Sequence, residues 1–199
     1  MIYPIVAFGD PVLKARAKDL PADLPADELQ QLVRDMFDTM YHAHGVGLAA
    51  PQVGKSIRLF VVDSAPMIDT EDEETGEPLP DAEKPVKRAF INPQKVSETG
   101  EEWGFEEGCL SIPGVREMVY RPETIVLRYE DEQRQVREET FSGMTARVIQ
   151  HEYDHLEGVL FTDKISGFKK QLIKGKLTRI SKGEVNADYR MRFAGQTRR

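Results

Sequence analysis

The chain has 199 residues and a mass of 22.6 kDa, a length that predicts one domain with a sizeable hydrophobic core. Its composition, 40% hydrophobic and 31% charged residues, is typical of a soluble globular domain and excludes fibrous and disordered classes. No apolar run approaches the roughly 20 residues that cross a bilayer, and the first residues lack the basic-then-apolar order of a secretory signal. The single cysteine excludes an internal disulfide framework, so we expect a cytoplasmic protein with no membrane partner.

Charge is unevenly distributed along the chain. The net charge of −7 argues against a protein built wholly around nucleic acid. Residues 169–199 nevertheless carry ten Lys and Arg against two acidic residues, a net of +8, which leaves −15 on residues 1–168. We therefore distinguish a main body, residues 1–168, from a basic C-terminal helix and tail, residues 169–199, within the same domain.

In chain order, residues 27–42 place apolar side chains at the i, i+3, i+4, i+7 spacing of an amphipathic helix. The apolar run 57–63 predicts a buried strand, and the stretch 69–83, with eight acidic residues, predicts a solvated loop. Further strands are expected at 88–92, 94–100, 124–130 and 134–141, with a turn at Asp131-Glu132. Helices are expected at 144–157 and 168–179. Strands flanked by helices indicate the α+β class.

The strongest chemical signal is HEYDH at 151–155. On a helix, His151 and His155 lie about 40° apart around the axis and about 6 Å apart along it, so both can bind one metal ion. On a helical wheel they share an apolar side with Glu152, whose buried carboxylate would need a partner. The other polar residues are expected to point away: Arg147, Gln150, Asp154 and Glu157. The alternative is a helix whose histidines are ordinary core residues.

A catalytic metal site needs a third protein ligand and leaves one position for water. The candidates are Cys109, His42, His44 or a carboxylate. Cys109 lies between Gly108 and Pro113, on a turn or strand end that can face a cleft, although a lone cysteine is often a small buried hydrophobe. The two other histidines are expected to flank the end of the first helix. Spacing favours a Cys/His/His site without proving it.

Three motifs together resemble those of peptide deformylases, and they occur in that family's order: GVGLAAPQ (45–52), EGCLS (107–111) and HEYDHLEG (151–158). The resemblance covers roughly residues 1–180. It implies an α+β fold with mixed or antiparallel sheets around a central metal-binding HExxH helix, followed by a C-terminal helix. It also implies that residues 1–168 form a metal-dependent catalytic domain that removes the formyl group from N-formyl-methionyl peptides and releases formate.

The resemblance also implies roles for individual residues. The metal ligands would be Cys109, His151 and His155. Glu152 would be the general acid/base, with an oxyanion hole formed by Gln52 and the backbone N–H of Leu110. The bound peptide would meet Gly45, Val46 and Gly47, with Arg116 at the mouth, and its methionine side chain would contact Val46, Met144, Val148 and the face of His151. Glu107 and Arg121 would form an ion pair behind the ligands. Arg147 departs from the family pattern and is expected to face solvent.

In this family the resemblance implies Fe2+ as the physiological ion, with Zn2+ or Ni2+ possible in purified protein. One rival interpretation is a zinc metalloprotease, which leaves the first two motifs unexplained. Another is a non-catalytic module, whose structural metal site would need four protein ligands. For the basic segment, one hypothesis is that Lys169–Lys182 contacts ribosomal RNA. The alternative is a helix that packs Leu172, Ile173 and Leu177 on the body.

Overall fold

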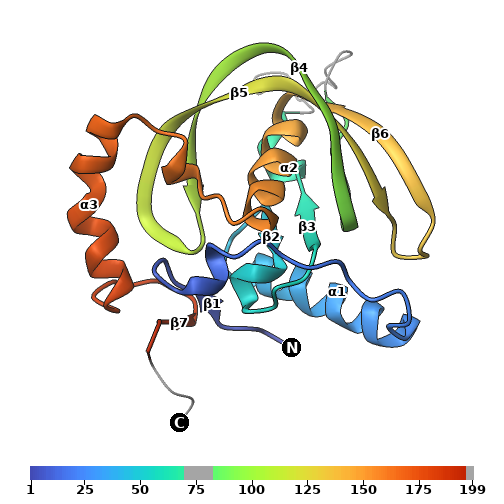
Figure 1. Ribbon diagram of the computed structural model, residues 1–199, viewed down its shortest axis with the longest axis horizontal. Coiled ribbons are helices and arrows are strands. Elements are labelled where there is room, and N and C mark those ends of the chain that lie inside the picture. Colours follow the sequence, from blue (N-terminus) through green and yellow to red (C-terminus); the bar gives the residue numbers. More distant parts are fainter. Residues whose placement is uncertain (70–82, 196–199) are drawn as a thin grey trace.

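The computed structural model describes residues 1–69 and 83–195, and it has the α+β architecture expected from the sequence. A five-stranded antiparallel sheet has the order β2-β3-β4-β5-β6, and a two-stranded parallel sheet pairs β1 with β7 (Figure 1). The strands are β1 (Ile5–Val6), β2 (Gly47–Ala49), β3 (Leu59–Asp63), β4 (Lys87–Cys109), β5 (Ile112–Glu130), β6 (Val136–Ser142) and β7 (Met191–Arg192). The helices are α1 (Ala26–His42), α2 (Gly143–Leu156) and α3 (Gly167–Ser181).

Strands β4 and β5 form one long hairpin that arches over α2 (Figure 1). Sequence analysis expected two separate strands at 88–92 and 94–100 and none at 101–123, and this part of the prediction is wrong. The register shifts between Ile91 and Gln94, and again between Thr99 and Glu102, which are irregularities that bend the hairpin without ending it. In residues 101–123 charged side chains are interspersed with apolar ones, and apolar residues lie on both faces of the strand: Val115 and Val119 are buried, whereas Met118 and Tyr120 are exposed. The sequence there therefore lacks the regular hydrophobic alternation that reveals a strand.

Helix α2 lies at the centre of the molecule, between the hairpin and strands β2 and β3 (Figure 1). It begins and ends one residue before the expected bounds, and Gly158 follows it with a φ of +72°. Its first turn is capped by Glu83, whose carboxylate accepts hydrogen bonds from the backbone N–H groups of Met144 (2.8 Å) and Thr145 (2.6 Å). The rest of the acidic stretch, residues 70–82, lies outside the described residues.

The expectation that the polar side of α2 faces solvent is wrong. Arg147 is only 3% exposed, and Gln150 and Asp154 are also buried. The β4–β5 hairpin covers this side and supplies partners: the Gln150 amide donates to the Pro122 carbonyl at 3.0 Å, and Arg121 forms a 2.6 Å ion pair with Asp154. The helix is therefore buried on both sides, and its polar residues are held by hydrogen bonds within the protein.

Helix α3 rests on the body at one side of the molecule (Figure 1). Ile173 and Ile180 are buried and Leu177 is partly buried, but Leu172 is 64% exposed and Phe168 is 74% exposed. The expected packing of Leu172 on the body is therefore wrong. Of the helices in the described part of the chain, none combines the length and hydrophobicity that a bilayer crossing needs.

Candidate metal centre and active site

Three potential metal ligands from two distant parts of the chain come together. Cys109 ends β4, and His151 and His155 lie one turn apart on α2, with all three ligand atoms within 4.8 Å of one another. The Cys109 Sγ lies 3.3 Å from the His155 Nε2. His42 ends α1 and His44 is an exposed residue beyond it, so neither joins this group.

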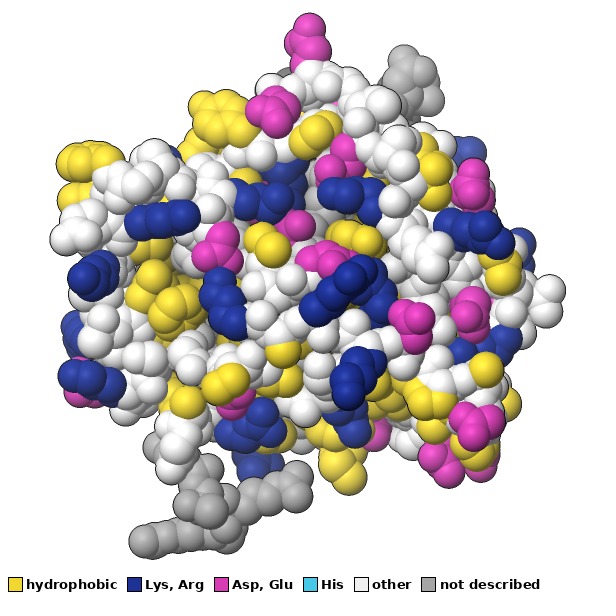
Figure 2. Space-filling view, in the orientation of Figure 1, with side chains coloured by type: hydrophobic (Ala, Val, Ile, Leu, Met, Phe, Trp, Pro, Cys, Tyr) yellow, Lys and Arg dark blue, Asp and Glu magenta, His cyan; other side chains and the backbone are white. Residues whose placement is uncertain are grey.

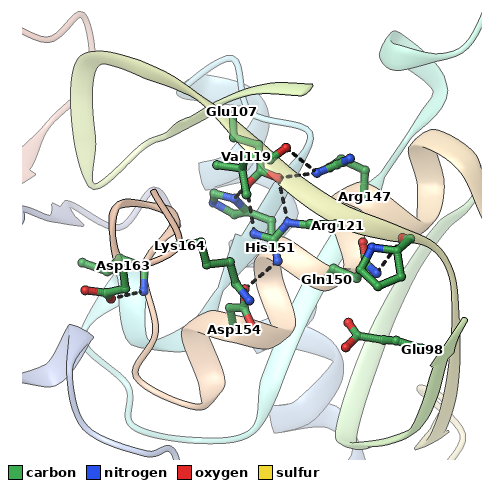
Figure 3. Close-up of polar contacts among 12 residues, drawn as sticks. Glu98, Glu107, Val119, Arg121, Arg147, Gln150, His151, Asp154, Asp163 and Lys164 are labelled. Atoms are coloured by element: carbon green, nitrogen blue, oxygen red, sulfur yellow. Dashed lines mark hydrogen bonds and ion pairs between the residues drawn. The ribbon is translucent and has the colours of Figure 1, made fainter. Parts of the chain in front are cut away.

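The second nitrogen of His151 is held by a carboxylate. Its Nδ1 lies 2.9 Å from Glu107, and Glu107 is in turn held by Arg121 through two hydrogen bonds of 2.7 and 2.9 Å (Figure 3). Arg147 donates to the same carboxylate at 3.1 Å and to the carbonyls of Trp103 and Val119. Burial alone would raise the pKa of Glu107, but its partners Arg121 and His151 hold that pKa well below its usual range. The carboxylate therefore stays ionised and orients the His151 ring.

Glu152 points from α2 toward the glycine at the start of β2. It is 4% exposed, and within the described residues its Oε2 has no hydrogen-bond partner. Burial raises the pKa of this carboxyl to about 7, a value that lets it both take and give a proton near neutral pH. A side chain at Gly47 would overlap Glu152, since a Cβ there would lie 2.5 Å from the Glu152 Oε1.

Gln52 and Leu110 lie next to the cysteine. The Gln52 Oε1 accepts a hydrogen bond from the Ala49 N–H at 2.8 Å, so its NH2 group is directed toward Cys109 Sγ (3.5 Å) and Ser111 Oγ (3.4 Å). Leu110 is the first residue of the turn that joins β4 to β5. Both residues expected to form the oxyanion hole therefore lie beside the three potential metal ligands.

The group opens into a cleft of about 960 Å³. Eight of the expected substrate and catalytic residues line it, namely Gly45, Val46, Gly47, Gln52, Leu110, Arg116, Val148 and Glu152. Met144 is half-buried at the start of α2 and is not among the described residues that line the cleft. The wall also includes a segment that sequence analysis did not single out, residues 186–189. The cleft is large enough for an extended peptide end.

The chemistry of these side chains fits a catalytic transition-metal site. A thiolate and two imidazoles suit Fe2+, Zn2+ and Ni2+ better than Mg2+ or Ca2+. The Glu107 carboxylate on His151 is the arrangement that usually orients a ligating histidine. Within the described residues the group has three members, whereas a closed structural site has four protein ligands. The geometry thus favours a catalytic site over the structural module considered from the sequence.

Comparisons with known proteins agree with this geometry. The family model for polypeptide deformylase matches residues 2–171. The chain belongs to this family. It is 57% identical over 197 residues to the peptide deformylase of Christiangramia forsetii, covering 97% of this chain and 96% of the relative. A solved peptide deformylase from Legionella pneumophila is 37% identical, with a TM-score of 0.75 over 92% of this chain and 98% of that one. A Met-Ala-Ser-bound deformylase from Acinetobacter baumannii is 35% identical, with a TM-score of 0.71 over 83% and 99%.

Two features of the site were missed by sequence reasoning. The buried contact of Arg147 with Glu107 had a weak signal, namely the departure of Arg147 from the family pattern. An arginine is seldom buried unless it is paired, but the partner lies 40 residues away in the sequence. Tyr189 donates a hydrogen bond to the Leu110 carbonyl at 2.8 Å across 79 residues. No local pattern marks that tyrosine, so its place beside the cleft emerges only from the fold.

Proposed function

We propose that the cleft around Cys109, His151 and His155 is where this chain hydrolyses the formyl amide of N-formyl-methionyl peptides. Its family makes it a hydrolase that removes the N-terminal formyl group from newly made polypeptides. The observation that carries the assignment of the site is the convergence of the three ligands beside Glu152, whose Oε2 lacks a partner within the described residues. Because the substrates are newly made chains, we assign the enzyme to the cytoplasm.

The three ligands would hold a divalent metal, for which we propose Fe2+ in the cell and Zn2+ or Ni2+ as alternatives in purified protein. When bound, such an ion lowers the pKa of a water and polarises a carbonyl oxygen. The chain's own residues then act on the water and the amide. Glu152 accepts a proton from the attacking water and passes it to the leaving nitrogen, and formate and a free amine are released.

The oxyanion that develops on the formyl oxygen would be stabilised by the Gln52 NH2 group and the Leu110 N–H. The orientation of Gln52 is fixed in advance by the hydrogen bond from Ala49, so these donors need little rearrangement during the reaction. Removing one such donor typically raises the barrier by about 2.7–4 kcal/mol. The backbone of Gly45 and Gly47 and the guanidinium of Arg116 would bind the peptide that follows.

A methionine side chain would fit between the apolar residues of the cleft. Val46, Val148 and His151 line it, and the His151 ring stacks on Phe161 with the ring centres 6.2 Å apart. Met144 precedes Val148 on α2, and we propose that it forms only part of this pocket. The Acinetobacter baumannii relative was solved with Met-Ala-Ser bound, a peptide that begins with this residue. This supports a methionine pocket at the same place.

The test is formate release from formyl-Met-Ala-Ser by anaerobically prepared protein, compared with cleavage of unblocked Met-Ala-Ser. We expect formate from the first peptide and no cleavage of the second; cleavage of the unblocked peptide would favour the protease interpretation. Glu152→Gln should retain metal and lose nearly all turnover. Glu138→Gln, at an exposed residue of β6, serves as the matched control and should behave as the unaltered enzyme. A metal-loaded Glu152→Gln with normal turnover would contradict the role of Glu152.

We further propose that α3 contacts ribosomal RNA by charge attraction. Lys174, Lys176 and Arg179 are exposed on it, next to the exposed Phe168 and Leu172. Figure 2 shows Lys and Arg side chains gathered along the edge of the molecule where α3 lies. A binding surface of this kind weakens steeply as salt concentration rises.

Co-sedimentation with ribosomes at low salt tests the contact. Reversing the three α3 charges to Glu should abolish co-sedimentation, whereas reversing three exposed charges outside α3 should not; suitable control positions are Arg34, Lys84 and Arg128. Substitution is preferable to deletion, because deletion would also remove β7 and its pairing with β1. Unchanged co-sedimentation of the α3 variant would exclude this surface.

A further inference from the structure

The turn that carries Leu110 is held by groups from outside its own hairpin. The Phe8 N–H donates to the Ser111 carbonyl at 2.8 Å, and the Gln52 NH2 group donates to the Ser111 hydroxyl at 3.4 Å. The third contact is the hydroxyl of Tyr189, which donates to the Leu110 carbonyl at 2.8 Å. The N-terminal segment just after β1, the Gln52 segment and the C-terminal segment therefore all fix this turn.

Tyr189 is brought to the cleft by the return of the chain after α3. Strand β7 pairs in parallel with β1, with Met191 opposite Ile5, and the Ile5 N–H donates to the Arg190 carbonyl at 2.8 Å. Arg192 adds a 3.5 Å ion pair with Asp10. The tyrosine ring itself packs on the same core cluster as the Leu110 side chain. The Tyr189 hydroxyl is thus positioned by a segment whose following residues are fixed by their pairing with β1.

This segment lies outside the part of the chain that the family model matches, residues 2–171. It still forms part of the cleft wall, since residues 186–189 line the cleft together with His44 and Gly45. Burial raises the pKa of the Tyr189 hydroxyl above its usual value, with the Cys109 and Asp188 charges acting in the same direction. The group therefore remains protonated and able to donate.

We propose that Tyr189 is a positioning residue for deformylation: its hydroxyl holds the Leu110 carbonyl and so keeps the turn that bears the oxyanion-binding N–H in place. The inference rests on the function proposed above. An oxyanion hole works because its donors are already oriented when charge develops. Loosening the 110–111 turn leaves the substrate free to bind but makes the N–H less often available to the oxyanion. The loss is therefore expected in kcat and not in KM.

Tyr189→Phe removes only the hydroxyl and keeps the packed ring. We expect kcat for formyl-Met-Ala-Ser to fall about threefold to tenfold, the worth of one net hydrogen bond, with KM and metal content unchanged. Hydrogen–deuterium exchange should become faster in the peptide covering residues 108–114 and stay the same in α1. The matched control is Tyr120→Phe, because Tyr120 is 62% exposed on β5, and it should leave every one of these readouts unchanged.

The outcomes separate this inference from the proposed function. If the unaltered enzyme releases no formate, the proposed function and the inference both fall. If it is active and Tyr189→Phe has the same kcat, the inference alone is overturned. A lower midpoint of thermal unfolding with unchanged kcat and unchanged exchange at 108–114 would likewise overturn it, since that pattern describes a purely structural tyrosine.

Discussion

Adding one methyl group at Gly47 should disable the enzyme without unfolding it. Gly47 begins β2 and pairs with Val62 of β3 on one side, while Glu152 packs against it from α2. A Cβ built on Gly47 would lie 2.5 Å from Oε1, 2.7 Å from Cγ and 2.8 Å from Cδ of Glu152. The φ of Gly47 is not in the left-handed region, so the backbone itself accepts alanine. The direct effect of Gly47→Ala is therefore a steric overlap between the new Cβ and the Glu152 side chain.

The size of the effect follows from these distances. Carbon atoms in contact prefer separations of about 3.5–4.0 Å, so Glu152 has to move by roughly 1 Å. It is buried and cannot swing into solvent. A misplacement of about 1 Å in a reacting group typically costs on the order of 10²-fold in rate, about 2.7 kcal/mol of barrier. Overpacking a buried site lowers the free energy of unfolding by about 1–3 kcal/mol, which leaves most domains folded.

Steady-state formate release, metal content and urea unfolding should be measured on the same preparations. The matched control is Gly175→Ala in α3, where an added Cβ meets nothing within 4 Å. Replacing a helical glycine in this way should raise the free energy of unfolding by about 0.5–1 kcal/mol and leave kcat unchanged. If Gly47→Ala bound metal normally and kept kcat within about threefold of the unaltered enzyme, Glu152 would not be the proton carrier at this position.

Three further predictions concern stability and the metal. Arg147→Met should lower the free energy of unfolding by about 3 kcal/mol, because it removes three hydrogen bonds, two buried and one partly buried, worth about 1 kcal/mol each; a urea titration giving less than about 1 kcal/mol would contradict this. Glu83→Ala should cost about 1–2 kcal/mol in the same assay through loss of the α2 cap, and an unchanged midpoint would refute the cap. Chelation should lower the thermal unfolding midpoint, because a metal that binds the folded state stabilises it, and should abolish formate release, because the metal's chemistry is lost. Anaerobic Fe2+ should restore both the midpoint and the activity, and an enzyme still active after complete chelation would exclude a metal role.

Elements with a strong local signal were predictable, whereas those that depend on distant partners were not. Residues 27–42 show helical periodicity, and the structure confirms a helix there, Ala26–His42. Residues 101–123 of the β4–β5 hairpin have no comparable periodic pattern. They form strands because they pair with each other across the hairpin, as Trp103 does with Arg121. The β7 strand is likewise defined only by its pairing with β1.

The same distinction applies to the site. The three motifs identified the side chains that converge, since their residue types and spacing carry the chemistry. The helical wheel failed for Arg147 because it assumes that one side of a helix meets the core and the other meets water. Helix α2 has protein on both sides, with Arg147 stacked on the Trp103 ring at 4.2 Å and paired with Glu107. A wheel reports which residues share a side, but the rest of the fold decides what covers that side.

The buried cluster around Glu107 also explains how His151 presents a free nitrogen to a metal ion. Arg121 and Arg147 both contact the Glu107 carboxylate, whose pKa stays well below its usual range, so it remains an ionised hydrogen-bond acceptor (Figure 3). A His151 ring that binds a metal through Nε2 keeps its proton on Nδ1, and Nδ1 lies 2.9 Å from that carboxylate. The hydrogen bond fixes this tautomer and leaves the Nε2 lone pair available to the metal. Burying Arg147 beside Arg121 thus supports the same tautomer that metal binding requires.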